Sequence, residues 1–407
     1  MDYADTNMNI LVFNCGSSSQ NYKLYQASES GVEVLCKGKA HRVGVVSKEP
    51  SFIEHDWDGH SERLELPIPN HAVAAGLILD FLQAKDFVID AVGHRFVHGG
   101  STYQRSTLIT PRVHASLPSL NPLAPIHNPN SLSVIDVCRE RLPGLPETLT
   151  FDTAFHANML ESAYTYALPA EWRERFGLRK YGFHGLSYQY VTRKAADFLQ
   201  RPLESLRMVA CHLGTGGSSV AAIQGGKSVD TSMGYSPLPG LMMSTRSGDL
   251  DAGIVVELLK QGMTCKAISD LLNKRSGLLG VSGFSSDIRD ILAAAAKDEN
   301  ARLAIDLYTQ RLRKTIGSFI TLLGGIDVLL FTDDIGLQNP SVRRLACQGL
   351  GWAGVELDEA KNESAALDGV SDVSRAGSAV RILVLPTDEE RVIAEETLRV
   401  LTEAAYG

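Results

Sequence analysis

The chain has 407 residues, a formal net charge of −8, and 44% hydrophobic and 21% charged residues. This length exceeds one ordinary hydrophobic core and predicts two domains or one elaborate domain. The composition is typical of globular proteins that dissolve in water. The acidic net charge disfavours nucleic acid as a partner.

The sequence shows no targeting or membrane signal. The N-terminal stretch lacks a basic region followed by a long apolar one. No apolar run approaches the roughly 20 residues that a membrane helix needs. We therefore expect a cytoplasmic protein without membrane contact. The cysteines are scattered without CxxC spacing, which predicts reduced and mostly buried thiols: Cys15, Cys36, Cys138, Cys211, Cys265 and Cys347.

The N-terminal part alternates short strands with turns. The expected strands are rich in β-branched and aromatic residues and cover 10–14, 22–26, 32–38 and 51–55. A helix follows, with Ala74, Leu77, Ile78 and Phe81 at the spacing of one helix face. The next expected strand covers 91–100.

The second half repeats this order. A strand at 207–214, a small-residue turn at 215–218 and a returning strand at 219–226 resemble the segment 10–26. A later helix has Ile316, Phe319, Ile320 and Leu323 on one face. The repetition predicts a duplicated α/β architecture with a ligand cleft between the halves.

Two small-residue turns carry groups that could bind anions. In "NCGSSS", Gly16 and the serines Ser17, Ser18 and Ser19 offer backbone N–H groups and hydroxyls. Such turns hold anions without a Walker lysine. The alternative is an ordinary polar hairpin turn. The second turn, His212–Ser219, has the same two interpretations, and two such turns facing one cleft would favour phosphate binding.

Two arginines lie in positions suited to oxyanions. Arg95 ends a strand in "GHRFVHGG", and Arg246 lies in "MMSTRSGDLD" before a helix expected to begin near Ser247 or Asp249. Guanidinium groups bind carboxylate and phosphoryl oxygens in pairs. The alternative for each arginine is a solvated or ion-paired surface group.

Several acidic residues and histidines are further candidates. Asp152 and His156 follow an apolar strand, and His184 lies between Phe and Gly; a single histidine of this kind is more often structural than catalytic. In "FTDDIGLQNP", Asp333 and Asp334 follow a buried strand where a turn is expected. They could form a metal site, a catalytic pair, or a plug in a former binding site.

Nine ordered segments together resemble the acetate kinase family, within the acetate and sugar kinase, Hsp70 and actin superfamily. They are "NCGSSS", "GHRFVHGG", "LAPIHNP", "FDTAFH", "YGFHGLS", "HLGTGGSS", "SMGYSPLPGLMMSTRSGDLD", "SGLLGVSGFSSDIRD" and "PTDEER". The resemblance implies an α/β fold of two ribonuclease H-like domains with a ligand cleft. The expected domains are 1–156 with 391–407, and 157–390, which carries the donor side.

The resemblance also implies an activity: reversible, direct in-line phosphoryl transfer between acetate or acetyl phosphate and ATP or ADP, with Mg²⁺ or Mn²⁺, by a homodimer. The implied catalytic residues are Arg95, Asp152, His184 and Arg246. The implied substrate-binding residues are Arg95, Val97, Ile126, His127 and Pro237. The implied metal-holding residues, which act largely through water, are Asn14 and Glu389. The implied phosphate- and nucleotide-binding residues are Ser17, Ser19, His212, Gly214, Thr215, Gly216, Asp287, Ile288, Arg289, Asp334, Gly336 and Gln338.

This sequence departs from the family pattern around the phosphates. The family's "GGIGEN" or "AGIGEN" is "DDIGLQ" here, so that Asp334 replaces the glycine that lies against adenosine. A carboxylate about 5 Å from an anionic ligand would repel it by roughly 3 kcal/mol. Smaller departures are Asn21, Leu186, Tyr188, Thr215 and Ser244.

Three readings follow from these departures. The first is an ATP-dependent acetate kinase with a tolerated loop variant. The second is a diphosphate-dependent acetate kinase with a blocked adenosine pocket. The third is a non-catalytic sensor of acyl phosphate or phosphate. The preferred substrate, acetate or propionate, also stays open, since a small apolar pocket distinguishes the two by only about 1–3 kcal/mol per methylene.

Overall fold

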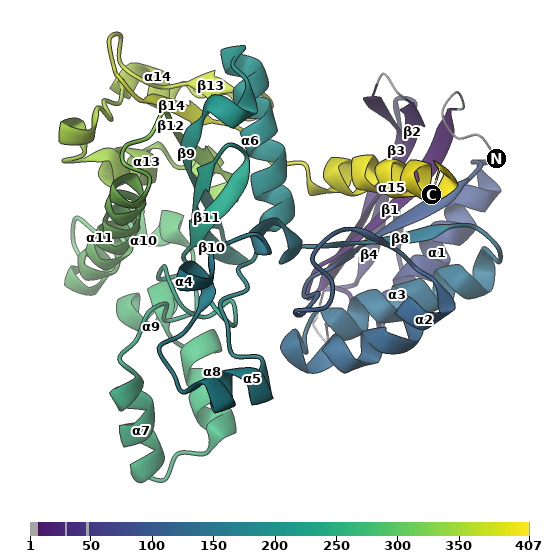
Figure 1. Cartoon of the computed structure of the whole chain (residues 1–407), viewed down its shortest axis with the longest axis horizontal. Coiled ribbons are helices and arrows are strands. Elements are labelled where there is room, and N and C mark those ends of the chain that lie inside the picture. The colour runs from purple at the N-terminus through teal and green to yellow at the C-terminus, as the bar shows by residue number, and fades with distance from the viewer. Residues whose placement is uncertain (1–6, 29–30, 46–48, 407) are drawn as a thin grey trace. The chain divides into compact units, whose positions relative to one another are not determined.

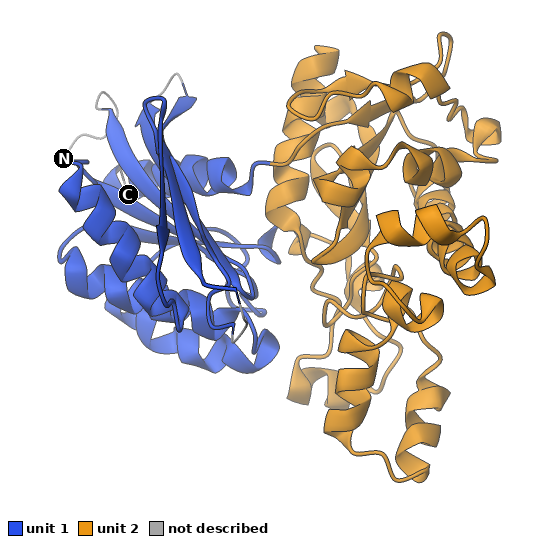
Figure 2. Cartoon of the chain, turned by 180° about the vertical axis from the view of Figure 1, so that it is seen from behind, with its two compact units in different colours: residues 1–155, 388–407 blue, residues 156–387 orange. Residues whose placement is uncertain are grey.

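The computed structural model describes residues 7–28, 31–45 and 49–406. It divides into two compact units, Met1–Phe155 with Asp388–Gly407 (unit 1) and His156–Thr387 (unit 2) (Figure 2). The expectation that the N-terminal stretch carries no targeting signal includes residues 1–6, which lie outside the described residues. Among the described helices, none is both long and apolar enough to cross a membrane.

Unit 1 is built on an eight-stranded sheet with the order β5-β4-β3-β2-β1-β6-β8-β7. The first five strands form antiparallel hairpins, whereas β6 is parallel to β1 and β8 is parallel to β6. The strands are β1 (Met8–Cys15), β2 (Ser19–Ser28), β3 (Gly31–His41), β4 (Phe52–Trp57), β5 (His60–Glu65), β6 (Ala91–Phe96), β7 (Thr107–Leu108) and β8 (Glu147–Phe151).

Helices cover both faces of this sheet. One side has α1 (His71–Ala84) and α3 (Asn128–Arg141), and the C-terminal helix α15 (Glu389–Tyr406) packs on β1, β6 and β8 (Figure 1). A Cβ atom at Gly93 in β6 would lie 2.5 Å from Thr397 Oγ1 and 2.8 Å from Ile393 Cγ2 of α15. Glycine at this position therefore allows α15 to pack closely on the strand that carries Arg95. The shorter helices are α2 (Pro111–Ser116) and the 3₁₀ helix η1 (Leu117–Leu123).

Unit 2 repeats the strand plan of unit 1. Its six-stranded sheet has the order β11-β10-β9-β12-β14-β13, with an antiparallel β9–β10 hairpin and with β12 and β14 parallel to β9. The strands are β9 (Arg207–Gly214), β10 (Gly217–Gln224), β11 (Lys227–Thr231), β12 (Val328–Thr332), β13 (Ser371–Asp372) and β14 (Arg381–Val384). The predicted duplication is therefore confirmed.

The long helix α11 (Glu299–Leu322) forms the main core of unit 2 with the sheet. Its buried Leu312, Ile316 and Phe319 pack in one cluster with residues of β9, β10 and β12. The helix α6 (Gly185–Leu199) lies on the opposite side of this sheet (Figure 1). The remaining helices are α4 (Glu161–Tyr164), α5 (Ala170–Phe176), α7 (Ala252–Lys260), α8 (Cys265–Lys274), α9 (Gly277–Ser282), α10 (Ile288–Ala294), α12 (Asp333–Gln338), α13 (Pro340–Cys347) and α14 (Glu359–Glu363).

Three local expectations were wrong. The helix expected near Ser247 or Asp249 begins at Ala252, because Asp251 is its N-cap and accepts a hydrogen bond from the Gly253 N–H at 2.8 Å. The stretch 333–338 is the short helix α12 and not a turn. The strand expected over 91–100 ends at residue 96. The prediction for the cysteines is confirmed: all six are free, and five are buried, Cys265 being exposed.

Unit 1 contains a buried histidine that predicts sensitivity to acid. The side chain of His55 is hydrogen-bonded through Nδ1 to the Tyr22 hydroxyl at 2.6 Å and stacks on Phe81 at 3.7 Å. Burial lowers the pKa of His55 from 6.5 to about 4. Because the folded-state pKa lies below the unfolded one, the unfolded chain binds more protons once the pH falls below 6.5.

We therefore expect the free energy of unfolding to decrease as the pH falls from 6.5 towards 4. Denaturant unfolding of the wild type and of His55→Gln at several pH values measures this. The slope should be shallower in His55→Gln and unchanged in His60→Gln, which alters an exposed histidine. Equal slopes in all three proteins would contradict the assignment.

Candidate active site

The half-site of unit 1 lies at the carboxyl ends of three neighbouring parallel strands. Asn14 is on β1, Arg95 on β6, and Asp152 follows β8 directly. Because β1, β6 and β8 are adjacent and parallel, their polar ends meet at one edge of the sheet. Arg95 donates from Nε to Asp152 Oδ1 at 2.8 Å and from Nη2 to Asp152 Oδ2 at 2.6 Å. This paired geometry fixes the guanidinium plane.

Arg95 stays charged in this setting. Burial alone would lower the pKa of its guanidinium, but the carboxylates of Asp152 and Glu389 outweigh burial and raise it. Its Nη1 also donates to Asn14 Oδ1 at 2.9 Å. The positive charge of Arg95 is thus both oriented and largely balanced within unit 1.

Acidic residues at the start of α15 complete this half-site. Asn14 Nδ2 donates to Glu389 Oε2 at 3.2 Å and to Glu390 Oε1 at 2.9 Å. Glu390 is buried, 7% exposed, and the sequence analysis did not select it. In the sequence, only its position next to Glu389 could have indicated a role in this half-site. Carboxylate and amide oxygens gathered in this way fit Mg²⁺, which prefers oxygen ligands.

Asn21, one of the departures from the family pattern, contacts the acids at the start of α15. Asn21 Nδ2 donates to Glu390 Oε1 at 3.2 Å. Lys23 lies two residues further along β2, on the same face of the strand. Its Nζ is 2.7 Å from Asp388 Oδ1 and 3.5 Å from Glu390 Oε2. Lys23 therefore supplies a positive charge beside the acids of α15.

The other predicted residues of unit 1 have mixed environments. Val97 is buried and Ile126 is 57% exposed, while His127 immediately precedes α3. The first small-residue turn is a tight hairpin closed by a 2.8 Å hydrogen bond from the Gly16 N–H to the Ser19 carbonyl. Ser17 at its tip is exposed. A hairpin and an anion-binding turn are both compatible with this geometry.

In unit 2, two histidines stack beside the second small-residue turn. The rings of His184 and His212 lie 4.0 Å apart at an interplanar angle of 27°. His184 Nδ1 is 2.9 Å from Ser219 Oγ, and His212 Nδ1 is 2.9 Å from Ser187 Oγ. These serines hold the rings in fixed orientations. His184 has a φ of 61° at the start of α6, a left-handed conformation that places its ring next to β10.

Arg246 differs from Arg95 because it has no internal counter-ion. Its Nη1 donates to the Pro237 carbonyl at 3.3 Å and contacts Met243 Sδ at 3.8 Å. Within the described part of the chain, no carboxylate forms an ion pair with it. Burial lowers the pKa of Arg246. A partly buried guanidinium of this kind is well placed to receive an anionic ligand.

Gly217 brings these groups together at the turn. A Cβ atom at this residue would lie 3.0 Å from Arg246 Nη1 and 3.5 Å from His184 Nε2. Gly217, the first residue of β10, therefore lies against both side chains directly after the turn residues Thr215 and Gly216. A cationic group, an imidazole and a small-residue turn converge here, which is the chemistry that phosphoryl oxygens require.

The two aspartates of α12 occupy hydrogen-bond donors of this turn. Asp334 accepts from the Thr215 N–H at 2.8 Å and from the Thr215 hydroxyl at 2.6 Å. Asp333 Oδ2 lies 3.0 Å from His212 Nε2. It would be only 2.0 Å from a Cβ atom at Gly214, so the carboxylate rests against the backbone. These carboxylates therefore use hydrogen-bond donors of this segment that an anion could otherwise contact.

The remaining predicted donor-side residues lie at the start of α10 and within α12. Asp287 is the N-cap of α10 and pairs with Arg289, Ile288 is buried, and Gln338 is exposed. Gly336 is buried, and its carbonyl accepts from Arg343 Nη1 at 2.9 Å.

The sequence analysis missed Arg343. This residue is 1% exposed and also donates to the carbonyl of Leu337 and to both oxygens of Asn362. Burial lowers its pKa to about 10. In the sequence, its position on the apolar face of α13 with Val342 and Ala346 was the feature that could have indicated a buried, structural arginine. It holds the C-terminal end of α12 in place.

Comparisons with known proteins show the family of this chain. The chain matches the model of the acetokinase family over residues 9–395. It is 44% identical over 406 residues to an acetate kinase of Dictyoglomus turgidum, covering 97% of this chain and 98% of that protein. It is 42% identical to an acetate kinase of Thermoanaerobacterium thermosaccharolyticum, covering 97% and 99%.

Solved structures give the same result. The acetate kinase of Entamoeba histolytica has a TM-score of 0.88 at 41% identity, covering 96% of this chain and 99% of that one. A propionate kinase of Francisella tularensis has a TM-score of 0.86 at 34% identity, covering 96% and 98%. The fold is therefore that of two ribonuclease H-like domains of the actin and sugar kinase type, as predicted. The chain belongs to the acetokinase family.

The contacts of Asp334 predict an effect on nucleotide binding. Asp334→Gly frees the N–H and hydroxyl of Thr215 and removes a negative charge. We expect ADP to bind tighter, by up to about a hundredfold, which corresponds to roughly 3 kcal/mol of repulsion. Calorimetric titration of ADP measures this. Asp368→Gly, which changes an exposed aspartate in unit 2, should leave the affinity unchanged. Equal affinity of Asp334→Gly and the wild type would contradict the prediction.

Proposed function

We propose that the chain is an acetate kinase that transfers a phosphoryl group reversibly between acetyl phosphate and ADP by direct in-line transfer. The observation that carries this proposal is Arg246, a partly buried cation that forms no ion pair with any described residue and lies beside His184 and Gly217. Phosphoryl transfer needs oriented positive charge more than covalent chemistry. Membership of the acetokinase family, whose relatives are phosphotransferases with a carboxyl acceptor, supports the same conclusion.

The two arginines take different roles in this proposal. Arg95 is oriented by Asp152 and is partly neutralised by it, so it positions the carboxylate of acetate and one face of the phosphoryl group. Arg246 carries a positive charge without a balancing carboxylate and stabilises the negative charge that develops on the equatorial oxygens. His184 is held through Nδ1 by Ser219, and its Nε2 side lies against Gly217, so we assign this ring to the phosphoryl oxygens.

A divalent cation fits the acids of unit 1. Asn14 and Glu389, with Glu390, would hold Mg²⁺, or Mn²⁺ in its place, largely through water. When bound, the cation neutralises phosphate charge. Val97, Ile126 and Pro237 are the proposed residues around the acetate methyl group, and His127 is a further proposed substrate-binding residue. A pocket of that kind separates acetate from propionate only weakly.

A second candidate donor has its own support. Asp334 stands at the position that the family resemblance places against adenosine, where its carboxylate is fixed by two hydrogen bonds from Thr215. This contact favours a diphosphate-dependent reaction, in which acetyl phosphate and phosphate give acetate and diphosphate. No contact in the described residues favours a non-catalytic sensor, since Arg95, Asp152, His184 and Arg246 are all present.

An assay with acetyl phosphate distinguishes these possibilities. Purified protein with Mg²⁺ is given either ADP or inorganic phosphate as the acceptor. The proposal predicts formation of ATP from ADP. Turnover with phosphate alone would select the diphosphate reaction, and turnover with neither acceptor would contradict the enzymatic proposal altogether.

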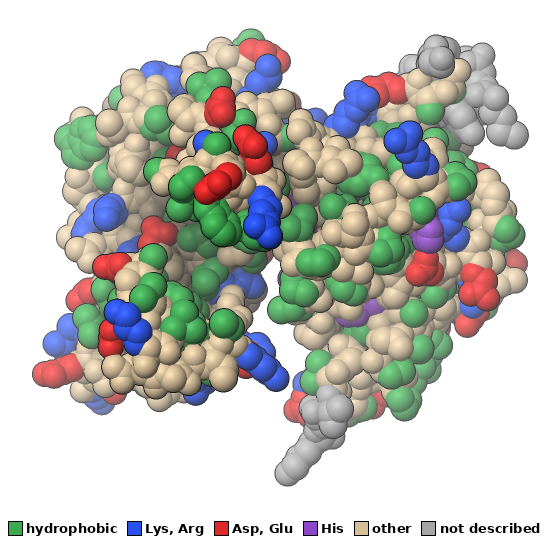
Figure 3. Space-filling model, turned by 60° about the horizontal axis from the view of Figure 1, so that its bottom comes forward, with side chains coloured by type: hydrophobic (Ala, Val, Ile, Leu, Met, Phe, Trp, Pro, Cys, Tyr) green, Lys and Arg blue, Asp and Glu red, His purple; other side chains and the backbone are tan. Residues whose placement is uncertain are grey.

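We also propose a cytoplasmic homodimer. Free cysteines throughout the chain suit a reducing compartment. The helix α7 has no buried residue and exposes Ile254, Val256 and Leu259 at 46%, 50% and 44%. Figure 3, in which the bottom of Figure 1 comes forward, shows hydrophobic side chains between charged ones on the surface. A second copy of the chain would bury such an apolar helix.

The dimer predicts a defined response to charge on α7. Ile254→Glu with Val256→Glu should convert the dimer to a monomer in sedimentation velocity experiments, because burying two carboxylates is unfavourable. Leu303→Glu changes a similarly exposed leucine on α11, at 50%, and should stay dimeric. A wild-type monomer, or an unchanged dimer in the α7 variant, would contradict this interface.

A further inference from the structure

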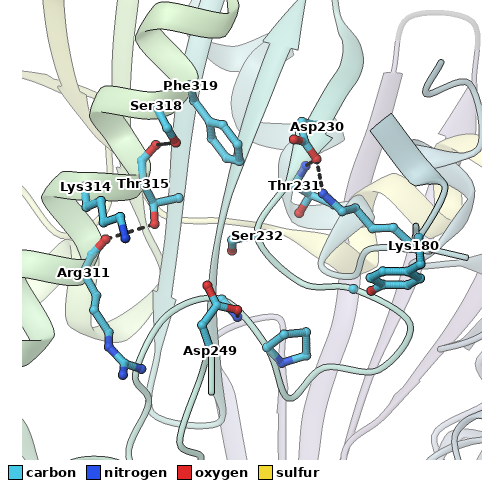
Figure 4. Close-up of a pocket in the computed structure, with 14 residues that line it drawn as sticks. Lys180, Asp230, Thr231, Ser232, Asp249, Arg311, Lys314, Thr315, Ser318 and Phe319 are labelled. Carbon is cyan, nitrogen blue, oxygen red and sulfur yellow. Dashed lines mark hydrogen bonds and ion pairs between the residues drawn. The ribbon is translucent and has the colours of Figure 1, made fainter. Parts of the chain in front are cut away.

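A second cavity lies in unit 2, away from the turn at Gly217. It has a volume of about 500 Å³ and is lined by fourteen residues (Figure 4). The walls come from α11, from the loop after β11 and from the segments around Lys180 and Asp249. This volume is in the range of small-molecule sites. None of the catalytic residues described above lines it.

The charged residues of this cavity leave a surplus of positive charge. Lys180 is paired with Asp230 on one wall, and Asp249 Oδ1 accepts from the Gly240 N–H at 2.8 Å. Arg311 and Lys314 lie on the opposite wall (Figure 4), three residues apart on one face of α11. Neither forms an ion pair with any described residue.

Arg311 retains most of its hydrogen-bonding capacity. Its Nη1 donates to the Ser247 carbonyl at 2.7 Å. A guanidinium has five N–H groups, so most of them remain for a ligand. Lys314 is exposed and offers three further donors. This wall therefore presents many N–H donors, and none of its lining residues from α11 carries a carboxylate.

Two hydroxyl groups add donors. Ser232 Oγ accepts from the Val220 N–H at 2.9 Å, and the Tyr166 hydroxyl oxygen accepts from the Tyr235 N–H at 3.0 Å. The hydroxyl protons of Ser232 and Tyr166 have no acceptor among the described residues. Burial raises the pKa of Tyr166, which keeps it protonated. The cavity as a whole is rich in donors and thus suits a ligand rich in acceptors.

The walls of the cavity are connected to the segments that carry the catalytic side chains. The Gly234 carbonyl accepts from the N–H groups of Tyr181 at 3.0 Å and Gly182 at 3.2 Å, just before His184. The Asp249 N–H donates to the Gly240 carbonyl at 3.0 Å and closes the loop that contains Arg246. The hydrogen bond from Arg311 reaches Ser247, the residue after Arg246.

We propose that this cavity binds a small oxyanion, with phosphate or carboxylate groups, and that its occupancy lowers turnover. The anion would bind between Arg311, Lys314 and the hydroxyl groups. It would bind the remaining N–H groups of Arg311, draw the guanidinium away from the Ser247 carbonyl and so loosen the loop that positions Arg246. The effect on turnover rests on the proposed function, whereas binding itself does not.

Binding is tested by calorimetry with two probes, glycerol 3-phosphate and malonate, which separate the phosphate source from the carboxylate source. At least one probe should bind. Lys314→Glu should weaken this binding by about tenfold or more, because it reverses a charge that contacts the ligand. Arg313→Glu makes the same change on a different face of α11 and should retain the wild-type affinity within about twofold.

A second comparison separates this cavity from the active site. Arg246→Met should leave the binding of the probe unchanged, since Arg246 does not line the cavity. Binding that is lost in Arg246→Met and retained in Lys314→Glu would overturn the proposal, and so would the absence of binding by both probes.

The effect on turnover is measured with saturating acetate and donor. The probe that binds should lower kcat in the wild type and not in Lys314→Glu, and higher acetate or donor should not relieve the effect. Relief by either substrate, or equal inhibition of both proteins, would overturn the coupling. If the wild type has no phosphoryl-transfer activity, the proposed function fails while the calorimetric result still decides the binding site.

Discussion

The paired hydrogen bonds between Arg95 and Asp152 are the contact on which the half-site of unit 1 depends. They exist because β1, β6 and β8 are parallel neighbours, so that residues far apart in the sequence meet at one edge of the sheet. Asn14 extends the contact from Arg95 to the acids of α15. The close packing of α15 on β6, which Gly93 allows, holds Glu389 within reach. One ion pair thus connects the sheet, the C-terminal helix and the proposed metal site.

Unit 2 has the same strand plan but a different distribution of charge. Arg246 has no carboxylate partner among the described residues, whereas His212 and Thr215 are contacted by Asp333 and Asp334. On one side of the β9–β10 turn, the positive charge of Arg246 can therefore bind an anionic ligand. On the other side, the carboxylates of Asp333 and Asp334 already contact the turn. A donor must compete with these carboxylates for the hydrogen-bond donors of the turn. Under the proposed function, the balance between the two sides would determine which phosphoryl donor binds.

Much of the fold followed from the sequence, because its strands are short, apolar and separated by small-residue turns. The repeated hairpin was visible in 10–26 and 207–226, and Arg95 at a strand end and Arg246 in a loop before a helix were recognisable as candidates. The contacts of Asp334 could not be predicted, since Thr215 is 119 residues away in the chain. Glu390 and Arg343 were missed for a related reason. Their roles depend on how α15 and α13 pack, and a sequence pattern does not specify that.

The carboxylates of unit 1 neutralise Arg95, whereas Arg246 forms no ion pair with a described residue and, in the proposed function, binds the anionic ligand. The affinity for inorganic phosphate in the presence of Mg²⁺, measured by calorimetry, tests this most directly. We expect Arg246→Met to weaken binding by about tenfold or more, the effect of losing a charge-assisted hydrogen bond. Arg95→Met should weaken it by less than about threefold, because Asp152 already balances that charge. Equal losses in the two variants, or no loss in Arg246→Met, would contradict the account.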